Sequence, residues 1–202
     1  MNAVEILAAI IFVICLGLAG TAHGQKTTSD PKAGKGKAAQ TKADLPKVTQ
    51  ITEAQFGDII KKSSAASRPV LVNFWATWCD PCREEFPDLV QIDADYRAKG
   101  LDLIVVSMDD LSELKTSVPK FLGEVKATMP SYLLMAKDEA AFLESVTVVT
   151  DKNDAVVGLP VTVLFDASGK IAYKRSGRIK PEVIRAEIDK LIPPVTKSSA
   201  TP

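Results

Sequence analysis

Two cysteines separated by two residues, Cys79 and Cys82, constrain this chain more than any other feature. They directly follow an apolar, β-branched and aromatic segment at 69–75, and residues 80–98 have the spacing of an amphipathic helix. We therefore expect the pair where a buried strand ends and a helix begins. The free N–H groups and the dipole of a helix N-terminus favour a thiolate on the first cysteine. The second lies one turn further along the same side, so that a disulfide can form and break with little backbone movement.

Cys79 is therefore the candidate nucleophile, whose thiolate would attack a substrate disulfide. Cys82, the less exposed thiol, would resolve the mixed disulfide. Pro81 between them fixes the turn. Two other interpretations stay open. The pair could be half of a zinc site, which needs two more soft ligands, or a structural bridge, although closing so short a loop removes little entropy from the unfolded chain.

The remaining cysteine and the single histidine, Cys15 and His23, both lie within the first 24 residues. If that segment is removed, no histidine remains, which excludes Ser-His-Asp and Cys-His triads and histidine-based zinc sites. We predict no metal and no cofactor besides a redox-active disulfide. Lys plus Arg and Asp plus Glu are both 25, so the excess of positive charge typical of nucleic-acid binding is absent.

Residues 1–24 contain a long apolar run followed by small residues, which is typical of a signal peptide or an N-terminal membrane anchor. They predict an extracytoplasmic protein, either periplasmic or anchored facing outside. Glu5 is the only charged residue before the run, and lysines follow it. This pattern favours the inverted orientation if the run is not cleaved. Residues 25–46, with five lysines, two aspartates and almost no large apolar residue, predict a flexible linker. A disordered tail is expected at 193–202.

The predicted domain spans residues 47–192, since 202 residues suffice for one sizeable domain but not for two. We expect strands at 48–51, 69–75, 101–108, 132–135, 161–165 and 171–174. We expect helices at 53–62 with Thr52 as N-cap, at 80–98 with a kink at Pro87, and at 111–122, 138–146 and 180–192. This alternation predicts an α/β fold in which a central mixed sheet is flanked by helices on both faces.

The segment 72–87 (VNFWATWCDPCREEFP) resembles the active-site segment of thioredoxin-fold proteins. It is most similar to the exported, tethered thiol-disulfide oxidoreductases of the TlpA/ResA type. The similarity continues through 105–109 (VVSMD), 158–162 (GLPVT) and 165–171 (FDASGKI). It implies a thioredoxin-like fold with a central insertion of the family type, for which residues 123–157 account, and an enzyme that exchanges protein thiols and disulfides.

The resemblance implies three more site residues. Pro160 aligns with the cis-proline that faces the cysteines, the alternative being an ordinary proline at a strand start. Glu85 matches an active-site glutamate that tunes the thiols and passes protons, the alternative being a solvated helix carboxylate. Trp78 would shape the substrate surface or simply pack in the core. Asn73 departs from thioredoxins proper, which carry a buried aspartate at this position. The proton route through that aspartate is therefore absent, which makes Glu85 the stronger candidate for proton transfer.

The residues around the cysteines predict the direction of electron flow. Asp80 places a negative charge beside the developing thiolate, which favours the disulfide, and Arg83 offsets this in part. We therefore expect a monomeric, low-potential reductant of disulfides. The resemblance implies exported cysteine-containing proteins as substrates, among them the haem-binding motifs of apocytochrome c, and a membrane electron carrier as the donor.

Three rival functions stay open. A thiol peroxidase would need a threonine three residues before its reactive cysteine, whereas Thr77 stands two before Cys79. A non-enzymatic thioredoxin-fold binding module would keep its function without Cys79. A disulfide isomerase usually works as a dimer, and no dimerisation segment is evident beyond the linker.

Overall fold

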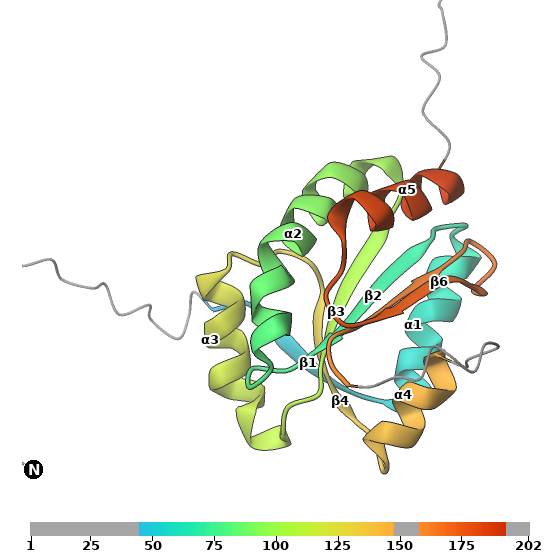
Figure 1. The fold of residues 1–202 in the computed structure, drawn as a ribbon. Helices are drawn as coiled ribbons and strands as arrows, with labels where there is room; N and C mark the ends of the chain where they lie inside the picture. Colours follow the sequence, from blue (N-terminus) through green and yellow to red (C-terminus); the bar gives the residue numbers. More distant parts are fainter. Residues whose placement is uncertain (1–44, 148–157, 193–202) are drawn as a thin grey trace, which may run out of the picture. The chain divides into compact units, whose positions relative to one another are not determined.

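The computed structural model describes residues 45–147 and 158–192 (Figure 1). The predicted signal peptide or anchor, nearly all of the linker and the predicted tail lie outside these residues. Within the described ranges, no helix has the length and apolar content needed to cross a bilayer.

In the described part, six strands form one mixed sheet in the order β1-β4-β3-β2-β5-β6. The strands are β1 (Val48–Thr52), β2 (Val70–Trp75), β3 (Asp102–Ser107), β4 (Ser131–Met135), β5 (Val161–Phe165) and β6 (Ile171–Ser176). The first four run parallel, and β5 is antiparallel to both β2 and β6. The carboxyl ends of the parallel strands therefore meet at one edge of the sheet, and β5 begins at that same edge.

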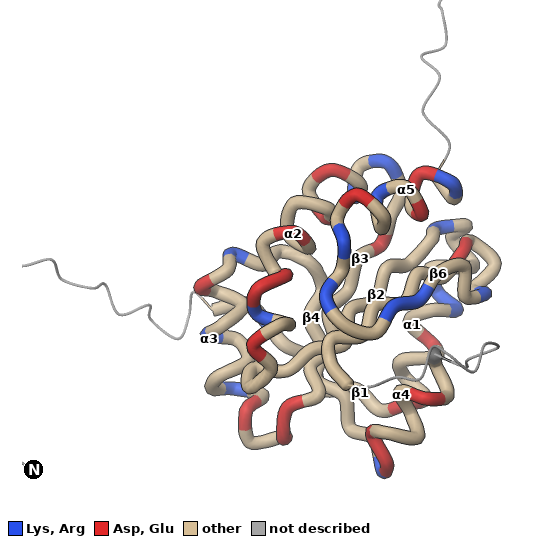
Figure 2. Tube along the Cα trace, in the orientation of Figure 1, with Lys and Arg blue, Asp and Glu red and all other residues tan. Residues whose placement is uncertain are grey.

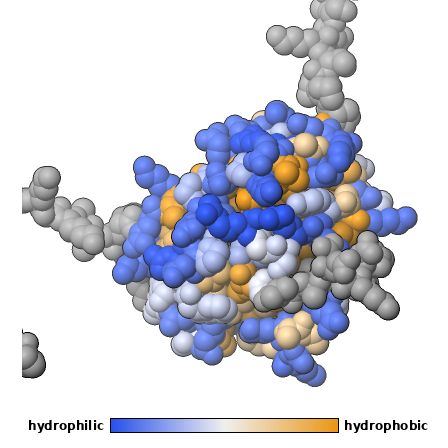
Figure 3. Space-filling view, viewed as in Figure 1, coloured by the Kyte–Doolittle hydropathy of each residue, from blue (hydrophilic) through white to orange (hydrophobic). Residues whose placement is uncertain are grey.

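Helices cover both faces of this sheet (Figure 1). They are α1 (Glu53–Ala65), α2 (Asp80–Tyr96), α3 (Ser117–Glu124), α4 (Glu139–Thr147) and α5 (Pro181–Leu191), with short 3-10 helices η1 (Arg97–Lys99) and η2 (Leu111–Lys115). The helices α2, α3 and α5 share one hydrophobic core with the sheet, and α1 and α4 share the other. The predicted α/β architecture is confirmed. Outside, the face shown in Figure 3 is mostly hydrophilic, with small hydrophobic areas between.

The alternation of side chains along β2 divides the core into two layers. Leu71 and Trp75 pack with α2, α3 and α5, whereas Val70 and Phe74 pack with α1 and α4. Asn73 lies in the alternating register of Leu71 and Trp75 and is fully buried. A polar side chain in the middle of an apolar layer must find hydrogen-bond partners there.

The helix predicted over 111–122 is wrong in one respect, because the structure has two helices there, η2 and α3, separated at Thr116. Pro119 lacks the backbone N–H that a continuous helix would need, so that the chain starts a new helix. The Glu113 carboxylate stabilises the break by accepting hydrogen bonds from Thr116 Oγ1 and the Ser117 N–H.

The other predicted elements agree with the structure within a few residues. Thr52 caps α1 in a capping box with Gln55. Helix α2 continues through Pro87, and the last residues of the predicted 80–98 helix form η1. The predicted insertion at 123–157 contains β4 and α4, and its residues 148–157 lie outside the described part.

Helix α4 is held on the sheet by Phe142, whose ring centroid lies 5.4 Å from that of Phe56 and 5.9 Å from that of Phe74. We predict that Phe142→Ala lowers the free energy of unfolding by roughly 3 kcal/mol, because it removes a buried ring and leaves a cavity. Phe142→Leu, the matched control, should cost less than half as much. Urea unfolding of the oxidised protein measures both, and an alanine variant as stable as the wild type would contradict this packing.

Candidate active site

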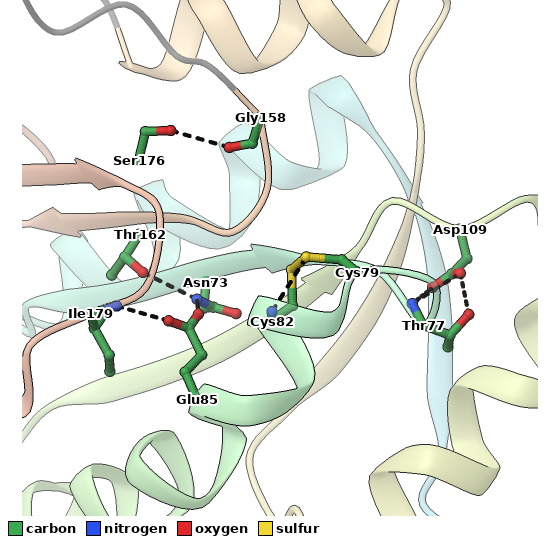
Figure 4. Close-up of a disulfide and its surroundings, with 10 residues drawn as sticks. All are labelled: Asn73, Thr77, Cys79, Cys82, Glu85, Asp109, Gly158, Thr162, Ser176 and Ile179. Carbon is green, nitrogen blue, oxygen red and sulfur yellow. Dashed lines mark hydrogen bonds between the residues drawn. A yellow bond between two sulfur atoms is a disulfide. The ribbon is translucent and has the colours of Figure 1, made fainter. Parts of the chain in front are cut away.

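Cys79 and Cys82 lie where β2 leads into α2, at the carboxyl edge of the sheet, and are joined by a disulfide (Figure 4). Cys79 is the N-cap of α2, and its Sγ accepts a hydrogen bond from the Cys82 N–H at 3.3 Å. The free N–H groups and the dipole of α2 therefore favour a thiolate at this sulfur. Cys79 is 6% exposed and Cys82 is fully buried, so that a substrate can reach only the first sulfur.

The loop before the disulfide is fixed by Asp109, which follows β3. Its carboxylate accepts hydrogen bonds from the Thr77 N–H at 2.9 Å, from Thr77 Oγ1 at 2.5 Å and from Ser107 Oγ at 2.7 Å. The ends of β2 and β3 are thus tied together two residues before Cys79. Sequence reasoning missed Asp109 as a site residue, although an acidic residue directly after a buried strand is a usable signal.

The residues around Cys79 form the surface of the site. Trp78 is 68% exposed, which rules out simple core packing. Asp80 and Pro81 are exposed as the first two residues of α2. The Arg83 guanidinium lies over the Phe121 ring, 5.1 Å from its centroid.

Glu85 lies one turn beyond Cys82 on the same side of α2 and is fully buried (Figure 4). Its two carboxylate oxygens accept hydrogen bonds from Asn73 Nδ2 at 2.7 Å and from the Ile179 N–H at 2.8 Å. The alternative of a solvated helix carboxylate is therefore contradicted.

Burial raises the pKa of Glu85 from 4.5 to about 7. The hydrogen bonds from Ile179 and Asn73 and the charge of Arg178 oppose this rise, whereas the charge of Asp88 adds to it. Near neutral pH this carboxyl group is therefore partly protonated, and it can both accept and release a proton one turn from Cys82.

Asn73 connects Glu85 to β5, because its Nδ2 also donates a hydrogen bond to Thr162 Oγ1 at 3.1 Å. Its Oδ1 is buried and has no hydrogen-bond partner among the described residues. The sequence prediction treated Asn73 only as the loss of a proton route. The structure adds that its amide donates a hydrogen bond directly to the buried carboxyl group.

Pro160 immediately precedes β5, and the Leu159–Pro160 bond is cis, as the resemblance implies. Its carbonyl oxygen accepts a hydrogen bond from the Gly177 N–H at 2.8 Å. Because Phe74 pairs with Val161, Pro160 lies at the edge of the sheet where β2 leads into the cysteines.

No group of three or more histidine, cysteine, aspartate and glutamate side chains suited to a metal ion occurs within residues 45–147 and 158–192.

A cysteine pair that opens a helix after a central strand of a mixed sheet, with a cis-proline at the start of the neighbouring strand, defines the thioredoxin-like class. The Redoxin family model matches residues 40–192, so this chain belongs to the Redoxin family.

Individual relatives agree with this assignment. A thiol-disulfide oxidoreductase ResA from Oceanobacillus iheyensis is 38% identical over 81 residues, which cover 40% of this chain and 41% of the relative. One from Bacillus thuringiensis subsp. konkukian is 24% identical over 184 residues, covering 91% of this chain and 94% of that relative. A solved Chlorobium tepidum structure, described as a thiol:disulfide interchange protein DsbE, is 26% identical with a TM-score of 0.51. That match covers 66% of this chain and 84% of the other.

The predicted similarity to the TlpA/ResA type is confirmed, and the chain is a thiol-disulfide oxidoreductase with the thioredoxin-like fold.

The buried carboxyl group predicts how stability depends on pH. The pKa of Glu85 is about 7 in the folded protein against 4.5 ordinarily, so the folded state binds the proton more tightly. The contribution of Glu85 to the free energy of unfolding is therefore fully present below pH 4.5. About 3 kcal/mol of it is lost as the pH rises through 7. Glu85→Gln cannot ionise and should lack this slope. Urea unfolding of both oxidised proteins between pH 4.5 and 7.5 measures the difference, and parallel profiles would contradict the assignment.

Proposed function

We propose that this protein acts outside the cytoplasm as a reductant of disulfide bonds in exported proteins. The Cys79 thiolate attacks one sulfur of the substrate disulfide, which forms a mixed disulfide and releases the other substrate sulfur as a thiolate. Cys82 then loses its proton, attacks Cys79 Sγ and releases the first substrate sulfur. The protein is left with the Cys79–Cys82 disulfide, two electrons have passed to the substrate, and the two substrate thiolates take up protons from solvent.

The observation that carries the direction of this reaction is a pair of carboxyl groups close to the cysteines, with no cationic residue between Cys79 and Cys82 in the sequence. Asp80 lies exposed between them in sequence, and Glu85 is buried one turn after Cys82. Negative charge near a sulfur disfavours its thiolate, and a disfavoured reduced form makes the pair an electron donor. The charge of Arg83 is expected to offset that of Asp80 in part, and its guanidinium lies over the Phe121 ring.

Glu85 supplies the proton transfer that the second step needs. As a carboxylate it can accept the proton that Cys82 loses before attack, and as a carboxylic acid it can return a proton when the disulfide is reduced again. A pKa of about 7 suits both directions near neutral pH.

The substrate segment would lie over Trp78 and along the backbone before Pro160, as an added extended strand. Acidic residues predominate on α2, and basic ones follow one another along β6 and the segment before α5 (Figure 2). Arg178 and Glu84 form an ion pair at 2.9 Å between these two regions. A bound segment would therefore meet opposite charges on its two sides.

Extracytoplasmic location is supported by the apolar run within residues 1–24 and by the similarity to ResA and DsbE proteins. We propose the haem-binding motifs of apocytochrome c as one substrate class and a membrane electron carrier as the donor. The peroxidase alternative is less well supported, because the Thr77 hydroxyl group donates its hydrogen bond to Asp109.

The reduced full-length chain tests this proposal against an oxidised peptide that carries a haem-binding motif. We predict that Cys82→Ser accumulates a mixed disulfide with the peptide at Cys79, seen by mass spectrometry, because the resolving thiol is missing. Cys79→Ser should reduce the peptide at least 10³-fold more slowly than the wild type, since it lacks the nucleophile.

An oxidised peptide with an unrelated cysteine pair is the matched substrate control. Reduction of that peptide alone would remove the cytochrome substrate and leave a general reductant. Full activity of Cys79→Ser would contradict the mechanism, and rapid turnover of hydrogen peroxide would favour the peroxidase.

A further inference from the structure

The two oxygens of Glu85 each face an N–H donor, Asn73 Nδ2 at 2.7 Å and the Ile179 N–H at 2.8 Å. This suits a carboxylate, which only accepts hydrogen bonds. A carboxylic acid in the same place carries one O–H group, and that group would point at another donor. The Ile179 N–H belongs to the backbone and cannot become an acceptor, so any adjustment to the protonated form must come from Asn73.

The Asn73 amide carries the acceptor that the protonated form needs. Its Oδ1 is buried without a partner among the described residues, while its Nδ2 serves both Glu85 and Thr162. A half-turn about the last side-chain bond exchanges Nδ2 and Oδ1 and occupies nearly the same volume. The oxygen then faces Glu85 and can accept a hydrogen bond from the O–H group of the carboxylic acid. Either orientation leaves one amide atom without a partner among the described residues, so neither is favoured by the number of hydrogen bonds alone.

Thr162 can follow this exchange without moving. A hydroxyl group has one donor and two acceptor sites. Thr162 Oγ1 now accepts a hydrogen bond from Asn73 Nδ2 at 3.1 Å, and after the half-turn it would donate one to Oδ1. Figure 4 shows the three side chains converging from α2, β2 and β5.

We propose that Asn73 and Thr162 are positioning residues for proton transfer at Glu85, the Asn73 amide turning its N–H group to the carboxylate and its oxygen to the carboxylic acid. This rests on the proposed role of Glu85 and adds how one buried site holds both of its forms. The carboxyl group can then gain or lose a proton without a movement of α2.

Other groups act on Glu85 but cannot replace this pair. On α2, Cys82 lies one turn before it and the charge of Asp88 raises its pKa, whereas the charge of Arg178, before α5, lowers it. From β2 and β5, the side chains in its hydrogen-bond network are Asn73 and Thr162, and neither of them ionises.

The experiment is an NMR titration of the oxidised full-length chain, in which the disulfide prevents Cys82 from titrating. Carbon-13 at the glutamate carboxyl groups reports Glu85, which is assigned by its absence in Glu85→Gln. Nitrogen-15 in the asparagine side chains reports Asn73. We expect the Asn73 amide signals to shift with the same midpoint as the Glu85 carboxyl signal. Amide signals that stay constant through that midpoint would overturn the proposal.

Variants give a second, independent readout. Asn73→Ala removes a donor from the carboxylate and should raise the Glu85 midpoint by about one pH unit. Thr162→Val should raise the Glu85 midpoint less. With the carboxylate it leaves an Asn73 N–H unpaired, and with the carboxylic acid it leaves Asn73 Oδ1 with one hydrogen bond fewer. The unpaired N–H costs more, so the carboxylate form is the more destabilised. Thr162→Ser keeps the hydroxyl group and should match the wild type, so that the two Thr162 variants decide the matter if Asn73→Ala does not fold. A wild-type midpoint in Thr162→Val would overturn the proposal.

The titration contains no substrate, so its result is separate from the proposed function. If the protein does not reduce the peptide but the Asn73 and Glu85 signals shift together as expected, only the proposed function is overturned. Constant amide signals in a protein that still reduces the peptide would overturn only the role of Asn73 and Thr162.

Discussion

The buried carboxyl group of Glu85 is the interaction on which the site depends. Through Asn73 it connects α2 to β2 and, one hydrogen bond further, to β5, and through the Ile179 N–H it connects α2 to the segment before α5. These contacts hold the first turns of α2, which carry both cysteines, against the sheet. Removing a partner from such a buried group would leave it unsatisfied, at a cost of about 1–3 kcal/mol or more for a charged one.

Two electrostatic effects of opposite sign act on the cysteine pair. The N-terminus of α2 favours negative charge on the Cys79 sulfur, which accepts a hydrogen bond from the Cys82 N–H. The carboxyl groups of Asp80 and Glu85 disfavour additional negative charge beside them. In the proposed mechanism, the first effect makes the Cys79 sulfur reactive, and the second favours the loss of electrons from the reduced pair. Both effects arise because α2 begins at Asp80, directly after Cys79, and carries Glu85 one turn after Cys82.

The strand and helix that carry the cysteines could be predicted from the sequence because their signals are local. The run of β-branched and aromatic residues at 69–75 and the helical spacing at 80–98 each lie within one segment. The break at Thr116 was missed because the apolar pattern continues across it, although Pro119 marks it.

The contacts of Asn73 could not be predicted from the spacing of residues in the sequence. Its partners Glu85 and Thr162 lie 12 and 89 positions away in the chain, on a helix and on another strand. Asp109 was missed for the same reason, since Thr77 lies 32 positions before it. A polar residue in a central strand can thus be recognised in the sequence, but its hydrogen-bond partners can be identified only in the folded structure.

The reduction potential of the Cys79–Cys82 pair tests the central claim, that this protein donates electrons to disulfides. The full-length chain would be equilibrated in graded thiol/disulfide buffers and followed by the fluorescence of Trp75 and Trp78, with Cys82→Ser as the control that cannot form the disulfide. We predict a potential of roughly −270 to −220 mV, in the range of thioredoxin and the glutaredoxins. A value near about −120 mV, typical of a strong oxidant, would contradict it.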